Sequence, residues 1–174
     1  SWGKGTEPKP INWYAGKQYD DCFGTAHEEL NNFDEQFPQW KGRGYEIVGF
    51  AWWQGDKDRY NAGHASRYEK NLVHLIKTLR KEFKAPKAKF VVATLGQTVR
   101  DSAEENEKLI LDAQLAVAGT AGKYPEFKGN VATVYTHPLS QGGASNSHYD
   151  GNAQTYMDIG LAMGESMVKL LEGK

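Results

Sequence analysis

The sequence predicts an α/β domain in which helices cover both faces of a parallel β-sheet. Three short apolar runs, at residues 45–53, 89–96 and 130–137, are rich in β-branched and aromatic residues, as buried strands are. Each run is followed by a segment whose apolar residues recur with helical spacing. Alternation of strand and helix is typical of parallel sheets, whose strands are joined by crossover helices. A length of 174 residues fits a single domain with a substantial core.

The chain begins with an irregular arm and a first helix. Residues 1–16 are rich in Gly, Pro and Lys, which predicts no regular structure. From Gln18 to Phe33 the apolar residues have the spacing of a helix with one buried face. Pro38 and the Gly42-Arg43-Gly44 stretch then interrupt the chain before the first strand.

The first strand and its following helix come next. The stretch "YEIVGFAWW", residues 45–53, is a nearly continuous apolar run, which predicts a strand covered on both faces. After a polar loop, residues 65–83 place apolar side chains along one helical stripe. Pro86 lies just beyond this predicted helix.

The second and third strands, "KFVVATLG" and "NVATVYTH", are each followed by a helix. Ser102 and Glu105 have capping-box spacing, which predicts that the intervening helix begins at this point. The last helix is expected to begin near Asn152. It is expected to bury Tyr156, Ile159, Met163, Met167, Leu170 and Leu171. Gly160 and Gly164 lie one turn apart in it, where small residues would permit close packing.

Composition excludes several classes of function. A formal net charge of −1 gives no indication of nucleic-acid or anionic-membrane binding. One cysteine, Cys22, allows no internal disulfide and no multi-cysteine metal site. No stretch is long and apolar enough to suggest a membrane span, and no metal-ligand spacing is recognisable, so no metal or cofactor is expected.

Polar residues follow all three predicted strands. In open parallel sheets, ligands bind beyond the carboxyl ends of the strands. The residues at these ends are Gln54, Gly55, Asp56 and Asp58 after the first strand, Thr94, Gly96, Gln97 and Thr98 around the end of the second, and Thr136 and His137 at the end of the third. The loop "SQGGASNSHYDG" follows. We therefore expect Gln54, Gly55, Gln97, His137 and His148 to gather at one rim of the sheet.

The five histidines have different contexts. His148 lies in a glycine-rich loop before the last helix, and such a loop can present an imidazole to the rim. His137 ends a strand before Pro138, where it either contacts a ligand or binds a backbone carbonyl. His27 and His74 lie within helices, and His64 opens one, which favours surface or structural roles.

The Gln54–Gly55 step also has two interpretations. A glutamine amide beside a backbone N–H that a ligand can approach closely is able to stabilise a developing oxyanion. A plain turn after a strand would show the same two residues.

Two stretches of the sequence resemble a known family. "GFAWWQGDKD" resembles the Trp-x-Gln-Gly-Glu-x-Asp block of the sialate O-acetylesterase-like carbohydrate esterases of the SGNH hydrolase superfamily. "SHYDGNAQTYMDIGLAMGESM" resembles their C-terminal block, in which the catalytic histidine precedes a helix. The resemblance extends from about residue 45 to residue 171. It implies a flavodoxin-like three-layer α/β/α fold and hydrolysis of esters, usually acetyl groups on sugars.

The resemblance also assigns roles to residues. Family members use a Ser-His-Asp triad, in which His148 would be the general base. Gln54 and Gly55 match the step that lines the oxyanion region, and Asp56 stands where the family usually has a supporting Glu. By their place at the rim, the side chains expected to border the sugar are Trp53, Gln97 and His137.

The sequence departs from the family pattern in three ways. It has no Gly-x-Ser step after a first strand, and "LGQT" at residues 95–98 follows an internal strand and carries a threonine. Ser145 stands where the triad aspartate is expected, so Asp150 and Asp56 are candidate replacements. The strands that would precede residue 17 are missing. We therefore expect a partial SGNH domain, the C-terminal portion of a longer hydrolase.

Two functions remain open at the level of sequence. The chain is either part of a carbohydrate esterase that needs an N-terminal segment carrying the serine, or a non-catalytic carbohydrate-binding or structural member of the same fold. On the first hypothesis the chain alone is inactive. The partners are then an acetylated carbohydrate and an N-terminal chain of the same protein. The resemblance implies a secreted or periplasmic protein, although the chain shows no signal peptide.

Overall fold

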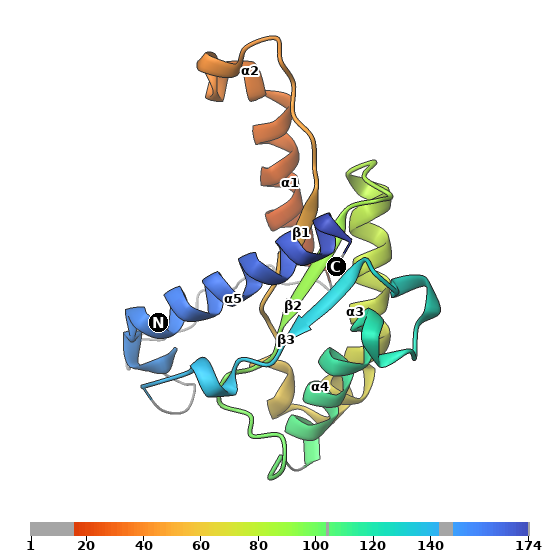
Figure 1. Ribbon diagram of the computed structural model, residues 1–174, viewed down its shortest axis with the longest axis vertical. Helices are drawn as coiled ribbons and strands as arrows, with labels where there is room; N and C mark the ends of the chain where they lie inside the picture. The colour runs from red at the N-terminus through yellow and green to blue at the C-terminus, as the bar shows by residue number, and fades with distance from the viewer. Residues whose placement is uncertain (1–15, 104, 143–147, 174) are drawn as a thin grey trace. The chain divides into compact units, whose positions relative to one another are not determined.

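The computed structural model describes residues 16–103, 105–142 and 148–173 (Figure 1). The chain forms two compact units, Ser1–Glu46 and Ile47–Lys174. The irregular arm predicted for residues 1–16 lies, apart from Gly16, outside the described residues. None of the described helices is both long and apolar enough to cross a membrane.

The described part of the first unit is helical. It contains α1 (Lys17–Asn31), the short α2 (Phe33–Gln36) and a 3-10 turn at Pro38–Trp40. The helix predicted over residues 18–33 is therefore divided at Asn32, where φ and ψ leave helical values. The ring of Phe33 lies 5.0 Å from that of Phe37 and 5.3 Å from that of Tyr45, which holds the end of the unit together.

The second unit confirms the predicted parallel α/β fold. Its three strands are β1 (Gly49–Trp52), β2 (Lys89–Ala93) and β3 (Val131–Val134). They lie in the order β1-β2-β3, and both pairs are parallel. Every residue of β2 after Lys89 is buried, so this strand forms the centre of the core.

Helices cover both faces of this sheet (Figure 1). α3 (Ala62–Glu82) and α4 (Glu105–Ala116) are the crossovers and pack against each other, while α5 (Ala153–Glu172) packs on β2 and β3. Consecutive strand residues point to opposite faces. A Cβ on Gly49 would meet Met167 of α5, whereas the ring of Phe50 lies 5.7 Å from that of Phe83 at the end of α3. α5 therefore lies on the face opposite α3, which gives three layers.

The first strand is shorter and more exposed than the sequence predicted. A strand covered on both faces was expected over residues 45–53, but the ladder spans only Gly49–Trp52. Tyr45, Val48 and Ala51 are exposed. The reason is that β1 lies at the edge of the sheet, and no other strand of the described residues pairs with its outer side.

Two details of the last helices also differ. α4 begins at Glu105 rather than near Ser102, so the predicted capping box is wrong. α5 begins directly after Asn152, as predicted, and the Asn152 side chain accepts a hydrogen bond from the Thr155 N–H. Of the residues expected to be buried in α5, Tyr156 and Leu171 are exposed.

Candidate active site

The loops that follow the three strands meet at one rim of the sheet, as expected from strand polarity. His137 Nδ1, after β3, lies 2.7 Å from the Gly96 carbonyl oxygen after β2. Gln97 Nε2 donates a 2.8 Å hydrogen bond to Asp56 Oδ1 in the loop after β1. These contacts join all three loops into one surface at the carboxyl ends of the strands.

The Gln54–Gly55 peptide is held in one orientation by buried side chains. The Gln54 carbonyl accepts hydrogen bonds from Tyr68 Oη at 2.6 Å and from Gln114 Nε2 at 3.0 Å. Tyr68 belongs to α3 and Gln114 to α4, and both are buried. Burial raises the pKa of Tyr68 to about 12, so its hydroxyl remains a donor at neutral pH.

This orientation determines where the Gly55 N–H points. In a trans peptide the C=O and the N–H point in opposite directions, so the Gly55 N–H points away from Tyr68 and Gln114. None of the hydrogen bonds found among the described residues uses this N–H. The direction of the Gly55 N–H, at a buried residue, is thus fixed by contacts with α3 and α4.

Only glycine fits this position. Gly55 has φ of 140°, in the region that residues with side chains rarely adopt. A Cβ there would lie 3.1 Å from Ile110 Cγ2 and 3.2 Å from Tyr68 Oη. The backbone can therefore pass close over α3 and α4 only because no side chain is present.

Asp56 is the centre of a polar network. Its Oδ1 accepts hydrogen bonds from Arg59 Nε at 2.9 Å and from Gln97 Nε2. Arg59 also pairs with Glu107 of α4. Burial alone would lower the pKa of Arg59, but the hydrogen bonds to Asp56 and Glu107 outweigh this and raise it. The guanidinium stays charged, and Asp56 serves to connect the loops.

Tyr149 anchors the loop that carries His148. Its hydroxyl accepts from the Gly96 N–H at 3.0 Å and donates to Gln97 Oε1 at 3.1 Å. Its ring stacks on Trp53, with centroids 5.6 Å apart and planes 20° from parallel. Burial raises the pKa of Tyr149, which favours the protonated hydroxyl that donates to Gln97.

The backbone around His148 is unusual. His148, Tyr149 and Asp150 have φ of 48°, 57° and 52°, so three consecutive residues with side chains adopt the left-handed conformation. The His148 side chain is exposed, and no hydrogen bond to it is found among the described residues. The turn therefore buries Tyr149 and leaves His148 exposed.

The other predicted site residues use some of their polar atoms in hydrogen bonds within the protein. Gln54 Nε2 donates to Asp58 Oδ2 at 2.6 Å, and Trp53 Nε1 donates to the Thr94 carbonyl at 3.1 Å. Gln97 uses both ends of its amide, for Asp56 and Tyr149. Because the Gly96 carbonyl can only accept, His137 Nδ1 carries the proton and Nε2 is left as an acceptor.

Two further predictions concern positions near His148. Asp150 is exposed and lies in the same left-handed turn. Ser145, at the family's usual aspartate position, lies outside the described residues. Within the described ranges, no group of three or more His, Cys, Asp or Glu residues could hold a metal ion.

Sequence reasoning missed four residues of this site, namely Tyr68, Gln114, Arg59 and Tyr149. Helical spacing over residues 65–83 indicates only that Tyr68 is buried, because the contact of its hydroxyl depends on how α3 packs under the β1 loop. For Tyr149 the sequence does contain one indication of a role in the site. It directly follows His148, in a loop that needs an anchor to the rest of the protein.

Comparisons with known proteins give one family and one fold. The family model for the carbohydrate esterase, sialic acid-specific acetylesterase, matches residues 4–169. Among solved structures, the X-ray structure of a protein from Arabidopsis thaliana matches with a TM-score of 0.54 at 22% sequence identity. The match covers 83% of this chain and 52% of the Arabidopsis chain, so this chain spans about half the length of that protein. No curated protein matches the sequence significantly.

Proposed function

The chain belongs to the carbohydrate esterase family of sialic acid-specific acetylesterases. On this premise we propose that it carries the general base and the oxyanion donors of an enzyme that hydrolyses acetyl esters on sugars. The nucleophilic serine comes from an N-terminal segment, either covalently joined or bound as a second chain. By its family resemblance, the enzyme acts in the periplasm or outside the cell.

The orientation of the Gln54–Gly55 peptide is the observation that carries this proposal. Two buried donors hold its carbonyl, so its N–H is fixed before any substrate arrives. A donor fixed in advance stabilises the negative charge of a tetrahedral intermediate without the cost of reorganisation. The side-chain amide of Gln54 lies in the same loop and donates to Asp58.

His148 acts as the base in this scheme. The serine oxygen attacks the acetyl carbon while its proton passes to the imidazole, and the acetyl oxygen becomes an oxyanion bound by the Gly55 N–H. Collapse of the intermediate breaks the bond to the sugar oxygen, which takes the proton from His148 and leaves as a hydroxyl. Water then attacks the acetyl-serine with the same base, and acetate leaves.

We assign the carboxylate that orients His148 to Asp150. Asp150 lies two residues away from His148 in the same turn. The sugar lies between the loops after β1 and β3. There the Nε2 atom of His137 can accept from a sugar hydroxyl, and Trp53 provides an aromatic surface beside Tyr149.

Hydrolysis of p-nitrophenyl acetate tests the proposal. The chain alone should show only the weak rate that oxyanion contacts give without a complete triad. Addition of an N-terminal segment with the Gly-x-Ser step should restore turnover, and His148→Ala should abolish it. His74→Ala is the matched control, because His74 is exposed on α3 and should leave turnover unchanged.

Two outcomes would contradict the proposal. Full turnover by the chain alone that survives His148→Ala would place the reaction elsewhere. Absence of turnover from the reconstituted pair, together with retained binding of acetylated sugars, would instead identify a non-catalytic carbohydrate-binding member.

A further inference from the structure

We propose that Gln97 is a positioning residue for His148, and that Asp56 determines which way the Gln97 amide faces. Gln97 lies between the loop after β1 and the turn that carries His148, and its side chain contacts one residue of each. This role rests on the proposed function, because that function makes His148 the base. It differs from the sugar contact that was expected for Gln97 from its place at the rim.

The orientation of the Gln97 amide follows from the charge of Asp56. A carboxylate accepts hydrogen bonds and cannot donate them, so the NH2 end of the amide must face it. Gln97 Nε2 accordingly donates to Asp56 Oδ1 at 2.8 Å, and the same oxygen accepts from Arg59 Nε at 2.9 Å. Gln97 Oε1 then faces Tyr149, whose hydroxyl donates to it at 3.1 Å. Asp56 therefore selects one of the two orientations that the amide can adopt.

The Tyr149 hydroxyl is held by two consecutive residues of the loop after β2. It accepts from the Gly96 N–H at 3.0 Å and donates to Gln97 Oε1. With the amide reversed, two donors would face the buried Tyr149 oxygen, and the hydroxyl hydrogen would lose its acceptor. A buried donor without a partner is costly, so the contact between this loop and Tyr149 depends on the amide orientation that Asp56 sets.

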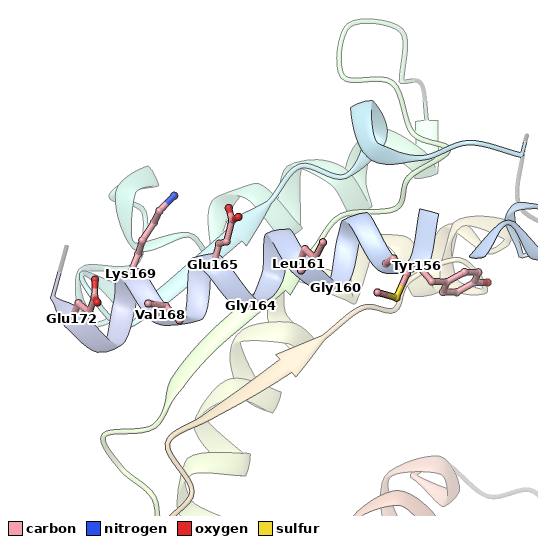
Figure 2. Close-up of a pocket in the computed structure, with 9 residues that line it drawn as sticks. Tyr156, Gly160, Leu161, Gly164, Glu165, Val168, Lys169 and Glu172 are labelled. Carbon is pink, nitrogen blue, oxygen red and sulfur yellow. The ribbon is translucent and has the colours of Figure 1, made fainter. Parts of the chain in front are cut away.

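The turn at His148 depends on such side-chain contacts because its backbone is strained. His148, Tyr149 and Asp150 all have φ in the left-handed region. On one side, the His148 carbonyl accepts from Tyr156 Oη at 3.0 Å, and Figure 2 shows Tyr156 at the amino end of α5. On the other side, Tyr149 joins the turn to the loop after β2. Loss of this second attachment would weaken the link between the base and the rest of the rim.

The contacts of Gln97 favour positioning over substrate binding. Its oxygen is used for Tyr149 and its NH2 group for Asp56. A sugar hydroxyl that took over either end would remove a bond that joins the turn to the loop after β1. A misplacement of about 1 Å can lower the rate of an enzyme about 10²-fold, so a rigid link to the base serves the proposed reaction.

Exchanging the amide and the carboxylate tests the direction of this chain of hydrogen bonds. Gln97→Glu places a second negative charge against Asp56, and repulsion should displace the side chain from Tyr149. Hydrogen exchange of the Gly96 amide, measured by NMR on the chain alone, should become at least about fivefold faster, as expected for the loss of one hydrogen bond. Gln97→Glu combined with Asp56→Asn restores one donor and one acceptor, so the rate should return to within about twofold of wild type. The ring signals of His148 should shift in the single variant and return in the double variant.

Tyr149→Phe provides a second test, because it removes the hydroxyl and keeps the ring that stacks on Trp53. The Gly96 N–H loses its acceptor, so its exchange should again be at least about fivefold faster. In this background Gln97→Glu should change the rate by less than about twofold, because the group through which it acts is gone.

Gln154→Glu is the matched control, because it makes the same chemical change beside another aspartate. Gln154 Nε2 donates to Asp158 Oδ1 at 2.6 Å, and Gln154 is exposed on α5. This variant should leave the exchange of the Gly96 amide and the ring signals of His148 unchanged. Faster exchange at Gly96 in this variant would contradict the inference, since a carboxylate pair outside the chain of hydrogen bonds would then have the same effect.

Kinetics of the reconstituted enzyme separate this role from the proposed function. Gln97→Glu should lower kcat at least about tenfold with KM unchanged, and Asp56→Asn should restore kcat in that background. Exchange rates that follow the expected pattern, without ester hydrolysis by the wild type, would support the positioning role and contradict the esterase. A raised KM with unchanged kcat would support the esterase and overturn the role, because Gln97 would then contact the sugar. A folded double variant whose Gly96 amide still exchanges fast would also overturn it.

Discussion

At the scale of single residues, the site depends on a peptide that two distant helices hold. Tyr68 and Gln114 both donate to the Gln54 carbonyl, and Gln114 Nε2 also lies 3.3 Å from Tyr68 Oη. A buried carbonyl with two donors has little freedom to rotate, because any other orientation would leave buried donors unpaired. The direction of the Gly55 N–H is therefore a property of the core rather than of the loop.

Gly55→Ala should destabilise the protein by about 1–3 kcal/mol, because the new side chain would adopt a strained backbone conformation against Ile110 and Tyr68. Urea unfolding measures this as a lower midpoint. Gly160→Ala is the control with the same chemical change, and it should stabilise the protein by about 0.5–1 kcal/mol because that glycine lies in an open part of a helix. Equal midpoints for the two variants would refute the argument.

The site residues differ in how far the sequence could predict them. Gln54, Gln97 and His137 follow strands, and strand polarity alone places such residues at one rim. Tyr68 and Gln114 lie at core positions of helices, where sequence periodicity indicates burial and says nothing about which carbonyl a polar atom will meet. The contacts of Gln97 with Asp56 and Tyr149 likewise depend on three loops at once.

At the scale of elements, the helices that begin after a capping asparagine were predicted best. α3 and α5 each begin after an asparagine whose side chain accepts a hydrogen bond from the backbone, and the predicted and observed bounds nearly agree. β1 was predicted too long, because an apolar run indicates burial but does not show that the strand lies at the edge of the sheet. Tyr156 and Leu171 of α5 were wrongly expected to be buried, because helical spacing alone does not show how wide the covered side of a helix is.

Loss of the cap of α5 should be measurable. In Asn152→Ala the Thr155 N–H loses its acceptor, and the expected cost is about 1 kcal/mol of unfolding free energy. Asn152→Asp should preserve most of the stability, because a carboxylate accepts the same hydrogen bond at a helix N-terminus. Thermal or urea unfolding of the two variants makes the comparison, and an Asp variant as unstable as the Ala variant would argue against the capping role.

At the scale of the whole molecule, stability should fall at alkaline pH. The pKa of Tyr68 is raised by burial from 10.0 to about 12. Below pH 10 both the folded and the unfolded states keep this proton, so stability is unaffected. Between about pH 10 and 12 only the unfolded chain releases it, and the unfolding free energy should fall by about 1.4 kcal/mol per pH unit for this group.

Tyr68→Phe tests that assignment, because it removes the group that titrates. Urea unfolding at several pH values should show lower stability than wild type at pH 8, by about 1 kcal/mol for the lost hydrogen bond. The decline above pH 10 should be shallower in the variant. Tyr45→Phe, at an exposed tyrosine of the first unit, should keep the wild-type slope. Parallel curves for wild type and Tyr68→Phe would show that other groups cause the alkaline loss.

The left-handed turn at His148–Asp150 has a consequence for the order in which the protein assembles. Each such residue costs about 1–2 kcal/mol relative to ordinary backbone, so the turn has no reason to form in isolation. Its compensation comes from Tyr149, whose hydroxyl binds Gly96 and Gln97 and whose ring stacks on Trp53. Those partners exist only after β1 and β2 have paired. The turn that carries His148 is therefore expected to form only after the sheet has closed.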